Sequence, residues 1–478
     1  MTNQRLLFAA SEVYPFAKTG GLADVAHALP RALNGMFAVE VVLPLYRFID
    51  REKYRIKPIS ERFEIVMGGR SYETQFFGCV YEGVTYRFVY SPLLCDRESL
   101  YGSPEAGYED NAIRFGIFNY ALLSMLDTHE YGIVHLNDWQ CALTALLLHT
   151  RTHIKTKVLY TIHNLAYQGI FPHSALKVLG IDESYFTMEA IEFYGQISFM
   201  KAGIAYADVV TTVSPTYAKE ILTEESGCGL EGFLQMHRHK LVGVLNGIDT
   251  DHFSPQNDAA LTHSYTDTKG KRPNKSDYLK SVGFKGINKP LFVFIGRFTW
   301  QKGMDLLIET LPKIAKLECN IAILGEGEKQ YLDPLQALCQ DYPNIRLHFG
   351  YDEVLSHRLY AAADFLLMPS LFEPCGLNQF IAFVYGTVPI VHHVGGLADS
   401  VKKVEKFALS CEDGFGIVFE RPTSRSFINA STKAMELYED KRRYNMIIKH
   451  NMSCDFSWNE SAKVYTALYL MDKQILKN

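Results

Sequence analysis

The sequence lacks any pair of cysteines spaced as Cys-x-x-Cys, although it holds nine cysteines. An odd number of scattered single cysteines favours free thiols in a reducing compartment over a disulfide framework. The sequence also lacks an apolar run near the ~20 residues that a membrane span needs; the longest, residues 141–148, is far shorter. The apolar run after Arg5 stops at Glu12, so we expect a first strand there and no signal peptide. A cytoplasmic location is expected by default.

Positive charge is not in excess either. The chain has 48 lysines and arginines against 53 aspartates and glutamates, a formal net charge of −5. Such a balance gives no electrostatic footprint for nucleic acid. With 47% hydrophobic and 21% charged residues, the composition is that of an ordinary globular protein. We expect neither nucleic acid nor a membrane as partner, and favour a neutral polymer or a small ligand.

Motifs of several enzyme classes are missing. Residues 325–327 read Gly-Glu-Gly, but Gln330 stands where a dinucleotide fingerprint needs its third glycine, which disfavours a dehydrogenase. Asp249 and Asp251 resemble the metal-binding pair of some sugar transferases, but a metal would need more ligands. No glycosidase pair of facing carboxylates is recognisable. We expect no metal and no cofactor. Histidines 237/239 and 392/393 are closely spaced, but neighbours in a strand point to opposite faces, which disfavours the second pair as metal ligands.

Short apolar runs alternate with helical stretches along the whole chain. Runs of four to six residues are too short for helices and are typical of buried parallel strands. Residues 59–91 alternate polar and apolar side chains, which indicates an antiparallel hairpin insertion. The strands expected in the first half are 5–10, 39–43, 133–136, 158–161, 209–213 and 241–245, with helices including 111–127 and 142–149.

A polar stretch at residues 254–276 has no apolar period and is interpreted as a domain boundary. Beyond it the alternation resumes, with strands expected at 291–295, 320–324, 345–349, 365–368, 388–391 and 417–419 and a final helix at 459–476. The fold class is therefore α/β, with two doubly wound Rossmann-like domains facing an interdomain cleft. The expected domains are 1–250, 251–455 and a C-terminal helical segment, 456–478, that packs back toward the first domain.

Residues 366–401 contain the densest set of functional signals. A buried strand leads into a loop that carries Glu373, and a helix is expected to open near Gly376. A second glycine turn precedes another helix after Gly396, and its letters, Gly-Gly-Leu-Ala-Asp, also occur at residues 20–24. Helix starts expose backbone N–H groups and positive dipole ends, which suit a phosphate. One such turn by itself is more often an ordinary strand-turn-helix.

Three cations follow expected strands. Lys18 lies in a glycine-rich turn before the first expected helix, and Arg297 and Lys302 flank the turn after strand 291–295. Point charges beside glycine turns suit an anionic leaving group such as a diphosphate. The alternatives are a solvated loop lysine and a surface turn.

Polar residues end several strands of the first half. Asp138 and Trp139 follow strand 133–136, an arrangement that can bind a sugar through its hydroxyls and its apolar face. The alternative is a helix-capping aspartate beside a core tryptophan. His163 and Asn164 end the next strand in the same manner, and Asn246 ends another.

Taken together, these blocks resemble the bacterial glycogen synthases and plant starch synthases, glycosyltransferase family five, which have the GT-B fold. The resemblance extends over the whole chain. It is carried by Ser-Glu-Val-Tyr-Pro at 11–15, Lys-Thr-Gly-Gly-Leu-Ala-Asp-Val at 18–25, the block 135–139, Thr-Ile-His-Asn-Leu-Ala-Tyr-Gln-Gly at 161–169, 296–303, 350–351, 356–358, Glu-Pro-Cys-Gly-Leu at 373–377, 385–387, 395–399 and 456–458.

The resemblance implies transfer of glucose from ADP-glucose to the non-reducing end of an α-1,4-glucan such as glycogen, with retention of configuration. It implies catalytic roles for Glu373, His163, Asp138, Lys302 and Arg297. It places ADP-glucose at Lys18, Gly20, Gly21, Arg297, Lys302, Tyr351, Glu373, Cys375, Gly376, Leu377 and Asn378. It places the glucose and acceptor side at Glu12, Asp138, Trp139, His163, Asn164 and Asn246.

The sequence departs from the family at Asn378, where threonine is usual; an amide can still donate to phosphate. Two alternatives remain, a retaining glucosyltransferase with another donor base or a small acceptor, and a non-catalytic glucan-binding protein. Cys375, next to a helix start and the cations, is expected to be the most reactive thiol, the alternative being a buried, inert cysteine.

Overall fold

The computed structural model describes residues 4–103, 106–408 and 413–471. The chain forms two compact units: unit 1 contains Met1–Asn246 and Trp458–Asn478, and unit 2 contains Gly247–Ser457. Residues 254–276, interpreted above as a boundary, lie inside unit 2, and α9 (Lys271–Ser281) begins within them. The polar composition of this segment was misleading because some of its charged side chains are buried in unit 2. Lys271 Nζ donates to the carbonyls of Tyr360 and Tyr385, both at 2.8 Å.

Unit 1 is built on a ten-stranded sheet in the order β13-β12-β8-β7-β1-β2-β6-β5-β3, with β4 paired to β5. Seven strands, from β13 to β6, run parallel, and all residues of β7 and β8 are buried, as the continuous apolar runs predict. The strands are β1 (Arg5–Ala9), β2 (Ala38–Pro44), β3 (Lys57–Pro58), β4 (Phe63–Met67), β5 (Arg70–Tyr81), β6 (Val84–Tyr90), β7 (Ile133–Asn137), β8 (Lys157–Ile162), β12 (Val209–Thr212) and β13 (Leu241–Gly243).

The expected hairpin insertion is present as the antiparallel strands β4, β5 and β6, and β6 also joins the parallel sheet beside β2. A separate antiparallel sheet contains β9 (Ile170–Pro172), β10 (Glu192–Phe193) and β11 (Gln196–Ser198). The helices of unit 1 are α1 (Gly21–Leu33), α2 (Pro92–Cys95), α3 (Asn111–Thr128), α4 (Asp138–His149), α5 (Ala175–Leu179), α6 (Phe199–Tyr206), α7 (Pro215–Glu220), α8 (Glu231–Met236) and α17 (Asn459–Leu470).

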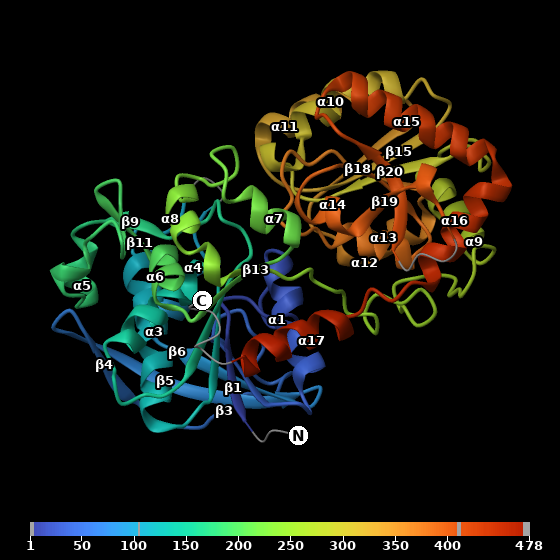
Figure 1. The fold of residues 1–478 in the computed structure, drawn as a ribbon. Coiled ribbons are helices and arrows are strands. Elements are labelled where there is room, and N and C mark those ends of the chain that lie inside the picture. Colours follow the sequence, from blue (N-terminus) through green and yellow to red (C-terminus); the bar gives the residue numbers. More distant parts are fainter. Residues whose placement is uncertain (1–3, 104–105, 409–412, 472–478) are drawn as a thin grey trace. The chain divides into compact units, whose positions relative to one another are not determined.

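Helix α17 belongs to unit 1 although it lies at the end of the chain, and it packs beside α1 (Figure 1). Its Tyr469 hydroxyl lies 2.7 Å from Nδ1 of His135 on β7, and Lys157 Nζ donates to the carbonyl of Leu468 at 2.5 Å. Buried polar contacts of this kind fix the helix because leaving either partner unpaired would be costly. The expected helix reached residue 476, and the part from 472 lies outside the described residues.

Unit 2 is built on a seven-stranded parallel sheet in the order β16-β15-β14-β17-β18-β20-β19, with helices on both of its faces (Figure 1). In its core, Phe292, Phe365 and Ile390 from the strands pack with Leu307 of α10 (Met304–Ile314) and Phe427 of α15 (Ser424–Glu439). The strands are β14 (Leu291–Ile295), β15 (Asn320–Gly325), β16 (Ile345–Phe349), β17 (Phe365–Met368), β18 (Val388–His392), β19 (Val401–Lys403) and β20 (Gly414–Phe419).

The remaining helices of unit 2 are α10 (Met304–Ile314), α11 (Lys329–Asp341), α12 (Glu353–Ala362), α13 (Asn378–Val384), α14 (Gly395–Ser400), α15 (Ser424–Glu439) and α16 (Lys441–Ser453). All twelve strands expected outside the hairpin are present, and the α/β class with two doubly wound units is confirmed. Among the described residues, none of the helices has the length and apolarity to cross a bilayer.

Candidate active site

Each parallel sheet has one point at which the direction of strand addition reverses. In unit 2, β14 and β17 are neighbours, and the chain adds β15 and β16 beyond β14 but β18 and β20 beyond β17. In unit 1 the neighbours are β1 and β7, with β2 beyond one and β8 and β12 beyond the other. Ligands of open α/β sheets bind at the carboxyl ends of such a strand pair. The loops after these four strands carry most of the residues singled out from the sequence.

In unit 2, Glu373 lies in the loop after β17 and is only 5% exposed. Its Oε2 accepts a hydrogen bond from Lys302 Nζ at 2.5 Å and one from Ser370 Oγ at 3.0 Å. Both contacts use Oε2, and within the described parts of the chain no group donates to Oε1. A buried carboxylate held at one oxygen, with the other oxygen left open, is suited to face a ligand.

Two glycines allow the loops of this site to pack closely. Gly303, after the 3-10 helix η3 (Trp300–Lys302), has φ +70°, and a Cβ there would lie 2.1 Å from the carbonyl oxygen of Pro369. A Cβ on Gly396 would lie 2.2 Å from the carbonyl oxygen of Cys375. Backbone therefore passes directly over backbone, which only glycine permits. This packing brings Lys302 to Glu373.

The two cations after β14 differ in their surroundings. Lys302 is paired with Glu373, whereas the guanidinium of Arg297 is exposed and makes no hydrogen bond or ion pair with any described residue. The sequence predicted both as diphosphate ligands. The structure brings Lys302 to the carboxylate and leaves Arg297 available to an anion.

The helix after Glu373 begins later than the sequence suggested. Gly376 has φ +72°, and α13 starts at Asn378, with Leu377 as its N-cap residue. The side-chain amide of Asn378 donates to the carbonyl of Ile295 at 2.7 Å, so it ties the start of α13 to the end of β14. An amide has two donor hydrogens. One is used in this contact.

In unit 1, Glu12 is buried and closes the loop after β1. Its Oε2 accepts from the backbone N–H of Thr19 at 2.5 Å and of Gly20 at 3.2 Å, and its Oε1 accepts from the hydroxyls of Thr19 at 2.7 Å and Tyr101 at 2.6 Å. The expected role of Glu12 was to line the glucose side. In the structure its carboxylate accepts hydrogen bonds from the glycine loop and from Tyr101, so the role on the glucose side stays a prediction. Tyr101 was missed because it comes from a distant, irregular segment.

Lys18 and the glycines lead into α1. Lys18 Nζ lies 2.7 Å from Asp24 Oδ1 in the first turn of the helix. Gly20 is the N-cap residue, and no side chain caps the helix. The half-buried lysine and the start of α1 thus lie together, and the anion site expected there stays a prediction.

Asp138 and His163 end β7 and β8, which are neighbours in the sheet. Asp138 has φ +54°, and its Oδ1 accepts from the backbone N–H of His163 at 2.8 Å. Burial raises the pKa of Asp138 to about 7, and the negative charge of Glu12 adds to that rise, although the N–H groups of His163 and Asn164 oppose it.

Burial lowers the pKa of His163 to about 3, so its imidazole is neutral at physiological pH. Its Nε2 lies 2.9 Å from Oδ1 of Asn137, whose amide nitrogen donates to the carbonyl of Ala9 at 2.9 Å. The Asn137 oxygen can only accept, so Nε2 of His163 carries the proton and Nδ1 is an acceptor. Asn137 was missed as a positioning residue because it lies at the buried end of a strand.

Trp139 packs among aromatic side chains. Its indole is buried, with ring centroids 4.8 Å from Phe115 and 5.7 Å from Phe171, and a Cβ on Gly169 would touch it at 2.5 Å. These contacts favour the alternative of a core tryptophan, and the expected place of Trp139 on the glucose side stays a prediction. Asp138, one residue earlier, is half-buried at the end of the strand.

The surroundings of three further residues that the sequence placed at the site, Asn246, Asn164 and Tyr351, differ from one another. Asn246 is buried, and its Oδ1 makes no hydrogen bond with any described group. Asn164 Oδ1 accepts from the N–H of Ala166 at 3.0 Å. Tyr351, after β16, is 65% exposed.

Cys375 is 5% exposed and lies under Gly396. The expectation that it is the most reactive thiol is not supported, because reagent must reach the sulfur. Cys228 is the exposed free cysteine among those described.

Family comparisons cover both halves of the chain. Residues 5–236 match the starch synthase catalytic domain, and residues 279–450 match the glycosyl transferases group 1. The glycogen synthase of Geotalea daltonii is 40% identical over 97% of this chain and 98% of the relative. That of Aquifex aeolicus is 41% identical over the same shares. The chain belongs to the glycogen synthase and starch synthase family.

Solved structures extend the family assignment to the fold. The catalytic domain of starch synthase IV from Arabidopsis thaliana, bound to ADP and acarbose, matches with a TM-score of 0.92 and 31% identity over 100% of both chains. Sucrose-phosphate synthase from Thermosynechococcus elongatus matches with a TM-score of 0.62 and 16% identity over 99% of both chains, which shows the fold alone. The two-domain GT-B fold is confirmed, and this member of the family is a glycosyltransferase.

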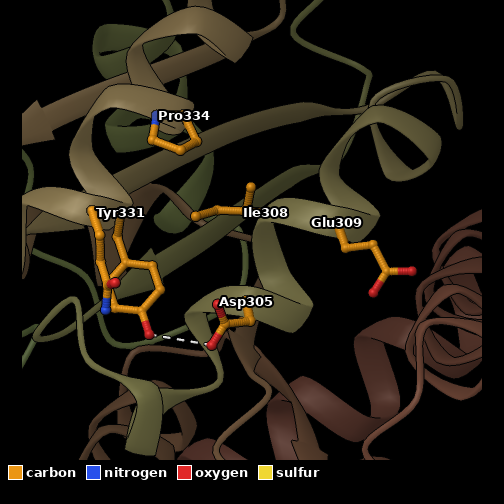
Figure 2. Close-up of a pocket in the computed structure, with 6 residues that line it drawn as sticks. Asp305, Ile308, Glu309, Tyr331 and Pro334 are labelled. Atoms are coloured by element: carbon orange, nitrogen blue, oxygen red, sulfur yellow. Dashed lines mark hydrogen bonds between the residues drawn. The ribbon is translucent and has the colours of Figure 1, made fainter.

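Unit 2 also has a small surface pocket. It is lined by residues of α10 and α11, and Figure 2 shows the hydroxyl of Tyr331 directed at Asp305, a hydrogen bond of 3.2 Å. None of the expected site residues lines it. The lining residues are Asp305, Ile308, Glu309, Gln330, Tyr331 and Pro334.

Proposed function

We propose that the protein elongates an α-1,4-glucan by transferring glucose from ADP-glucose to the non-reducing end, with retention of configuration. The observation that carries the proposal is the buried Glu373 carboxylate, held at one oxygen by Lys302 and Ser370 in a chain of this family. A starch synthase that binds ADP and acarbose, a nucleotide and an oligosaccharide, supports the choice of donor and acceptor.

In the proposed reaction, the bond between glucose C1 and the diphosphate oxygen breaks, and its electron pair leaves with ADP. The 4-hydroxyl oxygen of the acceptor forms the new bond to C1 on the face that the leaving group vacates. Its proton passes to the departing phosphate oxygen. The products are ADP and a glucan one residue longer, and no covalent nucleophile of the enzyme is needed.

Negative charge develops on the diphosphate, and positive charge develops on the sugar ring. Arg297 and Lys302 are proposed to bind the diphosphate, since Arg297 has an unoccupied guanidinium and the ammonium of Lys302 has three donors, of which Glu373 uses one. Preorganised cations lower the barrier to departure because they need no reorientation during the reaction. Glu373 is proposed to stabilise the cationic sugar.

The donor is further proposed to contact backbone N–H groups around Gly376 to Asn378, and Lys18 with Gly20 and Gly21. Tyr351, whose side chain is 65% exposed, is proposed to stack on adenine. Asp138, His163, Asn164 and Asn246 are proposed for the glucose and acceptor side. There His163 offers a neutral Nδ1 acceptor, and Asn246 offers a buried carbonyl oxygen.

The test uses purified protein with ADP-glucose or UDP-glucose, with and without glycogen. We expect nucleotide release that depends on glycogen and is faster with ADP-glucose. NMR of the elongated glucan should show new α-1,4 linkages, which report retention. A non-catalytic glucan-binding protein would bind glycogen without releasing nucleotide, and release without glucan growth would indicate a small acceptor.

A Tyr351→Ala variant tests the proposed adenine contact separately. Loss of stacking should weaken ADP-glucose binding by about tenfold, the effect of ~1–2 kcal/mol. A Phe variant should retain the affinity. Equal affinity in the Ala variant would move base recognition to another residue.

A further inference from the structure

Three side chains of unit 2 that the proposed reaction does not use converge on one point. One nitrogen of His252, one of His357 and a carboxylate oxygen of Glu353 all lie within 4.8 Å of one another. Glu353 and His357 are four residues apart on α12 and so share a face of that helix. We propose that these three residues bind a zinc ion.

The spacing fits a metal better than a hydrogen bond. His252 Nε2 and Glu353 Oε1 are 3.4 Å apart, beyond the ~2.7–3.2 Å of ordinary hydrogen bonds. A zinc tetrahedron with bonds of about 2.0–2.1 Å has edges of about 3.3 Å. The two atoms of this ion pair are therefore already at the distance expected of two zinc ligands, and the third ligand atom lies within 4.8 Å of both.

His357 is oriented as zinc-binding histidines are. Its Nδ1 lies 2.8 Å from Oδ2 of Asp258, which also accepts from the hydroxyl of Tyr385. The carboxylate can only accept, so Nδ1 of His357 carries the proton and Nε2 keeps its lone pair for a metal. A carboxylate behind a ligating histidine fixes its tautomer and raises its basicity.

The backbone of His252 is positioned by a hydrogen bond within the turn that contains it. Its backbone N–H donates to Asp249 Oδ1 at 3.2 Å, and its ring lies edge-on to His357 with centroids 5.1 Å apart. The ring of Phe253 stacks on the ring of His357, with centroids 5.1 Å apart. The Asp249 side chain, which the sequence suggested as half of a metal-binding pair, thus acts as a turn acceptor that positions a different ligand.

The ligand set selects the metal. Two imidazoles and one carboxylate suit zinc, whereas calcium and magnesium prefer oxygen alone. The side chains of His252 and Glu353 are 29% and 35% exposed, while His252 Nε2 and Glu353 Oε1 themselves are buried. A bound zinc ion would join the turn at residues 249–253 to α12 and stiffen that part of unit 2.

The test titrates metal-free, full-length protein with zinc against a chromophoric chelator, and repeats the titration with cobalt. We expect one equivalent of zinc and the visible absorption of tetrahedral cobalt. His252→Gln and Glu353→Gln should each weaken zinc binding at least ~10-fold, and Asp258→Asn should weaken it ~10-fold by releasing His357. Zinc should raise the Tm of the unmodified protein and not that of His252→Gln.

His173→Gln is the matched control. His173 and Glu183 form an exposed pair at 2.5 Å, and the described residues supply no third ligand there. This variant should bind zinc as the unmodified protein does. Circular dichroism checks that each variant is folded, and the half-exposed His252 and Glu353 make folding defects least expected in their variants. Binding of less than about a tenth of an equivalent, or unchanged binding by His252→Gln, would overturn the proposal.

Discussion

The two units carry the same five residues, Gly-Gly-Leu-Ala-Asp, at the start of a helix, yet each unit uses its neighbouring glutamate differently. In unit 1 the amide of Gly20 donates to the side-chain carboxylate of Glu12. In unit 2 the amide of Gly396 donates to the main-chain carbonyl of Glu373 at 3.0 Å. The glycine turn is anchored in both cases. Only in unit 2 does the anchoring leave the carboxylate to other partners.

The helices that follow differ as well. α1 has 13 residues and begins at Gly21, the second glycine of the shared motif, whereas α14 has 6 residues and begins at Gly395, the first glycine. Of the cations nearby, Lys18 is paired with Asp24, while Arg297 has an unpaired guanidinium among the described residues. Unit 1 therefore pairs Lys18 within its glycine loop, whereas unit 2 pairs Lys302 with Glu373 and leaves Arg297 without an ion pair among the described residues. Matching motifs do not imply matching roles.

Substitution of Glu373 tests the difference between the two units most directly. Glu373→Gln should reduce kcat by at least ~100-fold, because a carboxylate that stabilises the cationic sugar is lost. Glucan elongation assays measure the rate, and ADP binding shows that the donor site persists. Glu309→Gln, an exposed glutamate of the same unit, is the control and should be unchanged. Near-normal turnover in the Glu373 variant would assign catalysis to another group.

Glu12→Gln should act on stability. The amide group replaces one acceptor oxygen with a donor that faces the N–H and hydroxyl groups now bound by Glu12. Burial of mismatched donors should cost about 2 kcal/mol of unfolding free energy. Urea denaturation measures it, with the exposed Glu61→Gln as control. An unchanged midpoint together with a large loss of kcat would make the two glutamates equivalent after all.

Arg297→Ala should weaken ADP binding by about tenfold, the loss of one charge-assisted contact. Lys18→Ala should have a smaller effect because its ammonium already pairs with Asp24. Isothermal titration calorimetry of ADP with both variants compares the two cations. A larger loss for Lys18 than for Arg297 would contradict the inference from their pairing.

Asp138 should give unit 1 a pH-dependent stability. Burial raises the pKa of the folded Asp138 carboxyl to about 7, whereas the pKa in the unfolded chain is near the reference value of 3.8. Between these two pH values the folded chain therefore binds more protons than the unfolded chain. Stability then falls as pH rises through this window, by at most ~1.4 kcal/mol per pH unit. Asp138→Asn should flatten that slope in urea denaturation at a series of pH values. A slope that persists in the variant would belong to another group.

The smallest effect concerns the thiols. Iodoacetamide should modify exposed Cys228 before buried Cys375, because access limits the reaction. Burial and the charge of Glu231 raise the pKa of Cys228, so even this labelling should be slow. Peptide mass spectrometry gives the order. Labelling of Cys375 first would restore its sequence-based interpretation as the reactive cysteine.

The strands and the loops between them were determined by local sequence. Apolar runs such as residues 365–368 and 388–391 become buried parallel strands because only such runs satisfy a sheet covered on both faces. At Gly303 and Gly396 the structure shows backbone passing close over backbone, which explains why glycine stands at both positions. The family could likewise be inferred from ordered motifs, since each keeps its letters regardless of what lies opposite in space.

Only the tertiary structure decided what each side chain faces. Asp138 and Trp139 are adjacent in sequence, but one remains half-buried at a strand end while the other enters an aromatic core. Glu12 meets Tyr101, and His252 meets Glu353 and His357, across long stretches of chain. Sequence spacing cannot report such encounters, because they depend on which loops the sheet order brings together. The environment of a residue is set by its neighbours in space, and these are chosen by the fold as a whole.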